Sequence, residues 1–324
     1  MKHNMVEAIN QALSQEMARD PRVVVLGEDI GRNGGVFRVT DGLLAAFGPD
    51  RVMDTPLAES GIIGASIGMA AFGLRPVPEI QFMGFIYPAF NQILSHVARL
   101  RNRTRGTTTV PMVIRAPYGA GVRALEHHSE STEALFCHIP GLTVVVPSSP
   151  AEAKGLLLAS IRSEDPVVFL EPTRLYRADK EEVSDEPYEI PLRRARVVRE
   201  GRDLTIIAWG AMIPAALKAA EAAEKDGLSA EIVDLRTLSP MDRETVLASV
   251  RRTGRALIVH EAPRTCGLGA EIAALIAEKA LLNLAAPPLR VTGWDITVPL
   301  SKTEDDYYVG PDRVLAGIRR LLEF

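Results

Sequence analysis

The sequence predicts an α/β protein made of two three-layer α/β domains, each built on a mostly parallel sheet. Two observations predict this fold class. Short apolar runs alternate with helix-period segments in both halves of the chain, and a strongly charged stretch separates the halves. The chain has 324 residues, of which 47% are hydrophobic, so each domain can bury a core of its own.

In the first half, helical patterns fill the gaps between apolar runs. Apolar residues recur every fourth position from Met5 to Met17, and Asn4 with Glu7 matches a capping box at the start of that helix. Ser149, followed by a proline and then Glu152, predicts a second capped helix. The expected strands are residues 23–26, 77–80, 110–115, 142–146 and 167–170. This alternation is typical of a parallel sheet with helices on both faces.

The charged stretch marks the expected domain boundary, because 15 of the 27 residues from Arg177 to Asp203 are charged. We interpret residues 181–202 as a solvated linker between a domain of residues 1–180 and a domain of residues 203–324. The second domain is expected to contain strands at 204–208, 230–235, 256–260 and 289–293, and helices at 213–225, 242–251, 269–280 and 311–322.

Charge and composition exclude several classes of function. Lysine and arginine total 37 against 41 acidic residues, a net charge of −4, which favours neither a nucleic-acid partner nor an anionic membrane. The longest apolar stretch, residues 61–74, is too short to span a bilayer. Cys137 and Cys266 fall in different predicted domains, so a disulfide is not expected. We therefore expect a soluble, cytoplasmic protein.

The segment from Asp54 to Gly68 is the strongest candidate site, because a loop carries the lone carboxylate of Glu59 into an apolar, glycine-rich helix. In open parallel sheets, ligands bind in the loops that follow strands. The glycines allow close approach of another helix or of a bound ring. Local sequence leaves two interpretations open: Glu59 stabilises the helix N-terminus through the helix dipole, or it is a catalytic carboxylate.

Two further segments carry candidate residues. Residues 79–90 contain four aromatic residues, which either stack on a planar cofactor or pack in the core; core packing is favoured for Phe82 and Phe90. His127 and His128 lie in a Glu-His-His-Ser-Glu-Ser segment that either donates protons or forms a polar surface turn. The spacing to Cys137 matches no usual zinc site. The sequence also contains no phosphate-binding loop and no dinucleotide fingerprint.

Taken together, these segments resemble the β subunit of the E1 component of 2-oxo acid dehydrogenases, a family that includes the pyruvate and branched-chain 2-oxo acid enzymes. The resemblance runs from Val6 to the C-terminus. It rests on GED at 27–29, GGVFRVT at 34–40, DTPLAESGI at 54–62, RPVPEIQF at 75–82, HHSES at 127–131, PGLTVVVPSSP at 140–150, DPVVFLEP at 165–172, VDLRTLSP at 233–240, GRALIVHEAP at 254–263 and VTGWD at 291–295.

The resemblance implies a transketolase-like pyrimidine-binding domain followed by a transketolase C-terminal domain. It further implies a thiamine diphosphate enzyme that decarboxylates a 2-oxo acid, either a branched-chain 2-oxo acid or pyruvate, and transfers the acyl group to the lipoyl group of E2. An E1 α subunit is expected to complete an α2β2 heterotetramer and to supply most ligands of the diphosphate and Mg2+, which agrees with the missing phosphate loop.

The resemblance also assigns residues to roles. Glu59 matches the carboxylate that activates the cofactor, and His128 matches an active-site histidine that binds substrate or assists acyl transfer. Leu57, Gln81 and Phe85 match positions around the cofactor's pyrimidine ring. Some relatives bind a structural potassium ion where this chain has Ser160, Ser163 and Asp165, and serine replaces the usual acid at 163.

For E2, the resemblance implies that the C-terminal domain grips a small basic module. The Phe324 carboxylate and the acidic run from Glu304 to Asp306 are the candidate receptors for its arginines. Two alternatives are a stand-alone transketolase-like enzyme and a non-catalytic E2-docking subunit. The first lacks the expected diphosphate and metal motif in this chain, and the presence of Glu59, Phe85 and His128 argues against the second.

Overall fold

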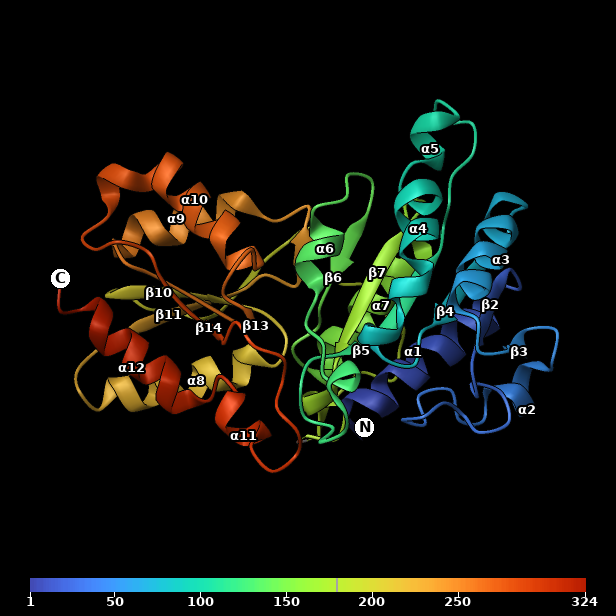
Figure 1. The fold of residues 1–324 in the computed structure, drawn as a ribbon, viewed down its shortest axis with the longest axis horizontal. Coiled ribbons are helices and arrows are strands. Elements are labelled where there is room, and N and C mark those ends of the chain that lie inside the picture. Colours follow the sequence, from blue (N-terminus) through green and yellow to red (C-terminus); the bar gives the residue numbers. More distant parts are fainter. Residues whose placement is uncertain (179) are drawn as a thin grey trace.

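The computed structural model describes residues 1–178 and 180–324, which form two α/β domains lying side by side (Figure 1). Each domain is a mostly parallel sheet with helices on both faces, so the predicted fold class is confirmed. Over the described residues, no helix has the length and apolar character needed to cross a membrane.

The first sheet has seven strands in the order β12-β6-β7-β5-β4-β2-β3. Neighbours from β6 to β3 are parallel, whereas β12 pairs antiparallel with β6 and comes from the C-terminal half of the chain. The sequence did not predict β3 or β12. The strands are β2 (Val23–Gly27), β3 (Val52–Asp54), β4 (Arg75–Glu79), β5 (Val113–Tyr118), β6 (Thr143–Val145), β7 (Val167–Pro172) and β12 (Thr237–Ser239).

Alternate side chains of this sheet enter two separate cores. Val167 and Phe169 of β7 pack with helices α1 (Met5–Arg19) and α7 (Pro150–Arg162) on one face. Val168 and Leu170 enter a core that includes Ile63 of α3 (Glu59–Ala71) on the other. This is the period-two alternation of a strand covered by helices on both faces.

Local capping fixes where the first-domain helices begin. Asn4 Oδ1 accepts the Glu7 amide at 2.9 Å, and the Asn4 amide donates to Glu7 Oε2 at 2.8 Å, so the predicted capping box is confirmed. Ser149 caps α7 by accepting the Glu152 amide at 3.4 Å. The Glu152 side chain does not close the predicted box but pairs with Arg196 at 2.9 Å.

The second sheet has five strands in the order β14-β13-β10-β11-β9. Helices α8 and α12 share a core on one face, and α9 and α10 contribute to the core on the other. The elements are β9 (Arg196–Arg199), β10 (Leu204–Ala208), α8 (Met212–Glu224), β11 (Ala230–Asp234), α9 (Arg243–Thr253), β13 (Ala256–Pro263), α10 (Leu268–Ala280), β14 (Leu289–Gly293) and α12 (Pro311–Leu321).

Shorter elements connect these layers. They are β1 (Lys2–His3), α2 (Leu43–Phe47), η1 (Met83–Phe85), η2 (Tyr87–Ala89), α4 (Phe90–Gln92), η3 (Ile93–Val97), α5 (Leu100–Arg103), η4 (Glu126–His128), α6 (Glu133–Cys137), η5 (Thr173–Leu175), β8 (Glu181–Glu182), η6 (Leu281–Asn283) and α11 (Glu304–Tyr307).

The segment 181–202 is more structured than the solvated linker that its charge predicted. Its β8 pairs with β1, and its β9 forms the edge of the second sheet next to β11. Lys154 of α7 donates to the carbonyls of Ser184 at 2.6 Å and Glu186 at 3.1 Å. Strand pairing and hydrogen bonds to its backbone therefore tie the segment to both domains. The exact domain limits stay a prediction.

A buried ion network lies at the centre of the first sheet. Arg115 of β5 donates from Nη1 to Glu79 at 2.8 Å, and from Nε and Nη2 to the two carboxylate oxygens of Glu171 at 2.7 and 2.9 Å. The Tyr176 hydroxyl also donates to Glu171. Burial raises the pKa of Glu79, and the Arg115 charge opposes that rise. Glu79 is the last residue of β4 and the first of residues 79–90, the aromatic segment. This network therefore fixes the point at which the aromatic segment leaves the sheet.

Candidate functional site

The predicted site residues leave the first sheet at its carboxyl edge. In the strand register, Gly27 of β2 pairs with Asp54 of β3 and with Glu79 of β4. The loops that begin at residues 28, 55 and 80 therefore start side by side. This edge is where open parallel sheets bind ligands.

Glu59 is the first residue of α3 and only 9% of its surface is exposed. The N-cap position belongs to Ala58, whose methyl group cannot accept a hydrogen bond. Helix α3 packs on β4 and beside η2, and it follows β3 at the carboxyl edge of the sheet, where the aromatic residues 82–90 also follow β4. A carboxylate at this position gains from the helix dipole, but its burial is costly unless it binds something there.

The sequence analysis did not single out Glu28 as a site residue. Burial raises the pKa of this carboxyl, and the nearby charges of Glu59 and Asp29 raise it further. Glu28 and Glu59 are therefore close enough to repel each other as carboxylates. The available signal was an acidic residue two positions after a predicted strand, at the edge where ligands bind.

In the loop between β3 and α3, residues 54 and 55 are held by hydrogen bonds, whereas Leu57 is exposed. Asp54 accepts the Gly31 amide at 2.6 Å, and the Thr55 amide donates to the Gly27 carbonyl at 2.9 Å. The Thr55 hydroxyl is buried without a partner among the described residues. Leu57 is 81% exposed. The loop thus presents Leu57 and an unsatisfied hydroxyl beside the Glu59 carboxylate.

The aromatic segment and the histidine segment meet. The His128 ring lies edge-on to Phe82, with centroids 4.5 Å apart, and to Phe85 at 5.2 Å. Phe82 is buried, as predicted, whereas Phe85 is half-buried. Phe90 packs on Phe136 at 5.7 Å. The structure therefore brings Phe85 and His128 together, in an arrangement typical of aromatic pairs.

His128 belongs to η4, and its Nδ1 lies 3.2 Å from the Leu125 carbonyl. The preceding His127 is exposed. A Cβ on Gly84 of η1 would lie 2.2 Å from the His127 carbonyl oxygen, so only glycine allows this approach of the two turns. Gln81 Nε2 donates to Asp29 at 3.3 Å, which places Gln81 beside the loop that follows β2.

The three residues predicted for potassium are engaged elsewhere. Ser160 donates to the Leu156 carbonyl at 2.7 Å, the Ser163 hydroxyl donates to the Asp165 carbonyl at 3.0 Å, and the Asp165 carboxylate pairs with Arg101. The guanidinium of Arg75 donates to the carbonyls of residues 161 and 163, both at 2.9 Å. Across the described chain, no three His, Cys, Asp or Glu side chains group to hold a metal. The potassium site stays a prediction.

A second group of acids is buried where the two domains meet. Burial raises the pKa of Glu133 to about 7, and burial together with the Glu133 charge raises the pKa of Glu261 to about 7. Burial also raises the pKa of Tyr118. Within the described chain, neither the Tyr118 hydroxyl nor either Glu133 oxygen has a direct hydrogen-bond partner. Near neutral pH the carboxyl groups of Glu133 and Glu261 therefore keep part of their protons, which they would release in an unfolded chain.

We expect the stability of the protein to fall as pH rises from about 4.5 to about 7, and Glu133→Gln to remove part of that fall. A raised carboxyl pKa means that the native state binds more protons than the unfolded state between the two pKa values. The expected loss is on the order of 2 kcal/mol for Glu133 alone. Urea unfolding at several pH values measures it, with exposed Glu278→Gln in α10 as control. An unchanged pH slope in Glu133→Gln would contradict the expectation.

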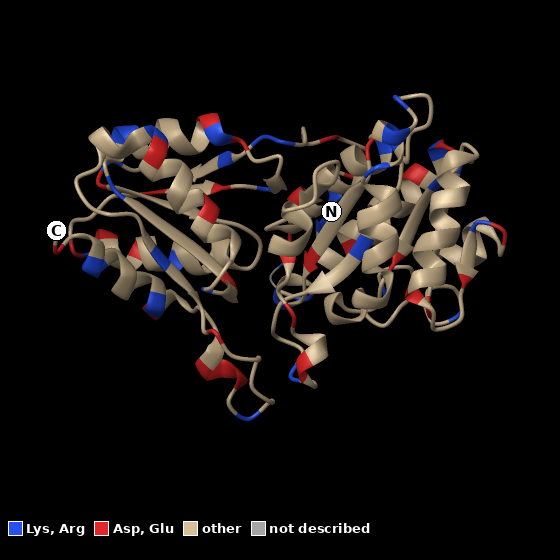
Figure 2. Ribbon diagram, turned by 45° about the horizontal axis from the view of Figure 1, so that its top comes forward, with Lys and Arg blue, Asp and Glu red and all other residues tan. Residues whose placement is uncertain are grey.

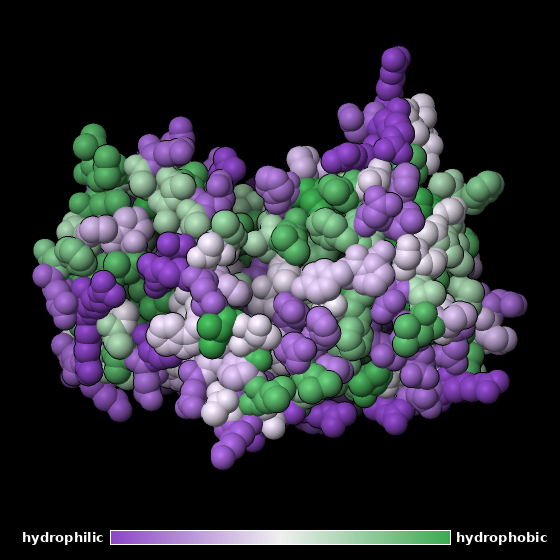
Figure 3. Space-filling model, viewed as in Figure 1, coloured by the Kyte–Doolittle hydropathy of each residue, from purple (hydrophilic) through white to green (hydrophobic). Residues whose placement is uncertain are grey.

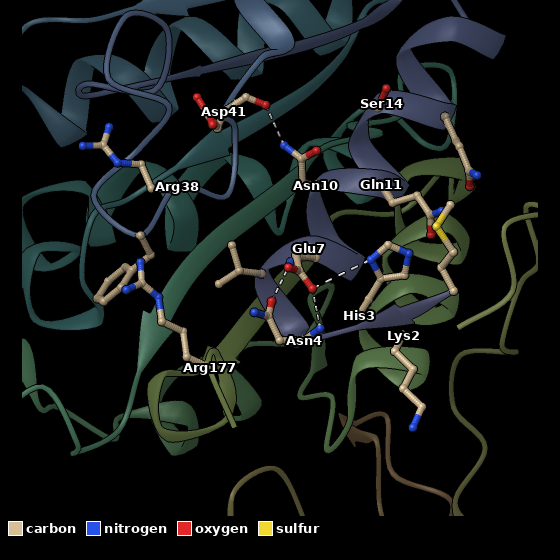
Figure 4. A pocket seen from close by; sticks show the side chains of 14 residues that line it. Lys2, His3, Asn4, Glu7, Asn10, Gln11, Ser14, Arg38, Asp41 and Arg177 are labelled. Carbon is tan, nitrogen blue, oxygen red and sulfur yellow. Dashed lines mark hydrogen bonds and ion pairs between the residues drawn. The ribbon is translucent and has the colours of Figure 1, made fainter. Parts of the chain in front are cut away.

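Two hollows lie away from the predicted residues. One, of about 700 Å³, surrounds the start of α1, where His3, Asn4 and Glu7 contact one another (Figure 4). Of its polar side chains, Asn4 and Glu7 form the capping box of α1. The other, of about 870 Å³, is a mostly apolar groove lined by residues of both halves of the chain. Both free cysteines, Cys137 and Cys266, line it. On the face drawn in Figure 3, hydrophobic residues lie in several separate groups among polar ones.

Of the acidic run predicted to receive E2 arginines, Asp305 and Asp306 are exposed, whereas Glu304 is not available, and that part of the prediction is corrected; docking of E2 stays a prediction. Glu304 is fully buried, and Asp305 pairs with Arg123 at 2.6 Å. A run of three acids in sequence does not reveal which of them faces inward. Phe324, the other predicted receptor, is 62% exposed.

Comparisons with known proteins agree with this geometry. The model of the transketolase pyrimidine-binding domain matches residues 1–179, and that of the transketolase C-terminal domain matches residues 193–314. The chain is 54% identical over 317 residues to a pyruvate dehydrogenase E1 component subunit beta from Acholeplasma laidlawii, covering 98% of this chain and 97% of that one. It is 50% identical to the protein of the same name from Staphylococcus epidermidis, covering 99% and 98%.

A solved structure described as a split gene transketolase, an inactive beta4 tetramer, superposes with a TM-score of 0.82 at 26% identity and covers 99% of this chain and 98% of that one. The similarity therefore spans both domains and the interface between them. The chain belongs to the family of E1 component β subunits, built from a transketolase pyrimidine-binding domain and a transketolase C-terminal domain.

Proposed function

We propose that the chain is the β subunit of a thiamine-diphosphate-dependent 2-oxo acid dehydrogenase E1 component, active with its α subunit in the cytoplasm. It decarboxylates a 2-oxo acid and passes the acyl group to the lipoyl group of E2. The observation that carries the proposal is the buried Glu59 carboxylate at the N-terminus of α3, at the same carboxyl edge of the sheet from which the 79–90 segment with Phe85 and its neighbour His128 begins.

The residues at this edge fit the pyrimidine half of the cofactor. A buried carboxylate, an orphan Thr55 hydroxyl, an exposed Leu57 and a half-buried aromatic ring are the groups that bind a polar, planar heterocycle. Glu59 would hydrogen-bond the ring, while Leu57 and Phe85 would contact its faces and Gln81 its rim. When bound, thiamine diphosphate supplies the electron sink for decarboxylation.

His128 is proposed to act on the substrate side of this site. Its ring is held between Phe82 and Phe85, and its Nδ1 faces the Leu125 carbonyl, which leaves Nε2 as the nitrogen available to a substrate. A fixed imidazole can hydrogen-bond a carboxylate or pass a proton during acyl transfer.

The diphosphate and Mg2+ are proposed to be held mainly by the α subunit, because this sequence has no phosphate-binding loop. An α2β2 assembly and docking of E2 on the C-terminal domain belong to the same proposal. The names of the relatives, pyruvate dehydrogenase E1 subunits, favour pyruvate over a branched-chain 2-oxo acid.

Co-expression with an E1 α subunit tests the proposal. We expect no 2-oxo acid turnover by the purified chain alone. With the α subunit we expect thiamine-diphosphate-dependent acylation of a lipoyl domain, with kcat/KM at least about ten-fold higher for pyruvate than for 3-methyl-2-oxobutanoate, since a larger side chain must fit a pocket shaped for a methyl group. Turnover by the chain alone would support a stand-alone transketolase-like enzyme, and preference for the larger substrate would reverse the assignment of pyruvate.

A further inference from the structure

The loop that carries His128, residues 119–130, is closed at its base. The Gly119 amide donates to the Glu130 carbonyl at 2.9 Å, and the Thr173 hydroxyl lies 3.1 Å from the Gly119 and Ala120 carbonyls. On the side of the first domain, η1 touches this loop through Gly84. The loop is thus attached to its own domain at both ends and along one flank.

The other flank is held by the second domain. The Ala120 amide donates to Glu261 Oε2 at 3.3 Å, and the next amide, of Gly121, donates to Glu304 Oε1 at 2.7 Å. Glu261 lies on β13 and Glu304 begins α11, and both are buried. Figure 2 shows the acidic α11 loop and the η4 loop projecting on the same side of the molecule.

The fit at these contacts is tight. Gly119 has a φ of +82°, and a Cβ there would lie 2.7 Å from Glu261 Oε1. Gly121 has a φ of +128°, and a Cβ there would lie 2.4 Å from Cγ of Arg174. Both positions therefore require glycine for two independent reasons, backbone conformation and space. The two consecutive amides thus donate to two buried carboxyl groups, by a short bond of 2.7 Å to Glu304 and a longer one of 3.3 Å to Glu261.

The second-domain side of this contact is itself rigid. Arg313 donates to the Tyr307 carbonyl at 2.9 Å and to the Thr292 carbonyl at 2.6 Å, which ties α11 to β14. The Tyr308 hydroxyl donates to Glu304, and the Arg174 guanidinium lies 4.1 Å from the Tyr308 ring centroid. Contacts other than those with the loop therefore fix the position of Glu304.

The ion pair between Arg123 and Asp305 is expected to contribute little to the stability of the loop. Arg123 pairs with Asp305 at 2.6 Å, but these side chains are 59% and 65% exposed. Exposed ion pairs contribute about 0–1 kcal/mol. The buried carboxylates, rather than this surface pair, are the groups able to fix the loop.

We infer that Glu304, with Glu261, is a positioning residue of the C-terminal domain that sets the conformation of the 119–130 loop and thereby the placement of His128. The part concerning His128 rests on the proposed function. The part concerning the loop does not, because it follows from the hydrogen bonds to residues 120 and 121.

Amide hydrogen exchange on the full-length chain tests the loop directly. In Glu304→Ala, we expect exchange of the Gly121 amide to accelerate at least about ten-fold, because its buried acceptor is gone. Glu304→Gln keeps an acceptor oxygen and should restore most of the protection. Asp306→Asn, an exposed change in the same short helix, is the matched control. Wild-type protection of Gly121 in Glu304→Ala would overturn the inference.

A double-mutant cycle in the reconstituted α–β enzyme tests the link to His128. We expect Glu304→Ala to lower kcat by about ten-fold or more in the wild-type background, because small displacements of catalytic groups are costly, and to have no effect in the His128→Ala background. Equal losses in both backgrounds would show that Glu304 acts only on stability and would overturn the positioning role. If the wild-type pair has no 2-oxo acid activity, the proposed function fails, while the exchange result still decides the role of Glu304 in the loop.

Discussion

Glu59→Gln in the reconstituted α–β enzyme is expected to lower kcat by about 10²–10⁴ while leaving the fold intact. This is the usual range for loss of a group that takes part in proton transfer. Glutamine has nearly the same shape as glutamate, so the packing of the α3 N-terminus and the positions of Phe85 and His128 should not change. Steady-state kinetics with pyruvate measure the loss, and calorimetric binding of thiamine diphosphate shows whether the pocket persists.

The same variant separates the two interpretations that the local sequence left open. If Glu59 only stabilised the helix through the dipole, its replacement would cost about 0.3–1 kcal/mol of stability and leave kcat unchanged. Glu244→Gln is the matched control, since Glu244 is an exposed glutamate in the first turn of α9. A kcat within two-fold of wild type in Glu59→Gln would contradict the catalytic assignment, whatever happened to Tm.

Arg115→Met is expected to destabilise the first domain by about 3–5 kcal/mol, the largest effect on stability that we predict. The change leaves the carboxylates of Glu79 and Glu171 buried without their cation, which is the costly way to break a buried ion network. Removing the charges as well, in Arg115→Met with Glu79→Gln and Glu171→Gln, should recover a large part of the loss.

Urea unfolding of the single and the triple variant measures these effects, with the midpoint and the slope of the unfolding curves compared at one pH. The control is Arg101→Met, which removes a half-exposed arginine paired with Asp165 and should cost less than about 1 kcal/mol. If Arg115→Met were no more destabilising than Arg101→Met, the network would not be the anchor that its geometry indicates.

Much of the fold follows from local pattern in the sequence. The capping box at Asn4 and the serine cap at Ser149 lie where they were predicted, because these residues act on amides only three positions away. Strands buried on both faces appear as apolar runs. By contrast, β12 has only three residues and pairs with a strand about 90 positions earlier, so no local period marks it.

The candidate site was predictable in part. Phe85 and His128 were expected in one site, and the structure places their rings 5.2 Å apart. Glu28 was missed because a single acid after a strand is common, and only the folded sheet brings it close to Glu59. Glu304 was assigned to the wrong environment, since charge along a sequence favours exposure unless a distant partner, here the Gly121 amide, compensates for burial.

The crossing of β12 into the first sheet has a consequence for how the chain can be divided. Although two family models meet near residue 190, the first domain made alone would end its sheet at β6, with an unpaired row of amides and carbonyls. Such an edge invites pairing with another molecule. The same fragment would also uncover Phe136, which shares a core with Trp209 of the second domain. Each half matches a family model of its own, yet we expect a chain divided between them to expose this sheet edge and part of the shared core until the pieces reassemble.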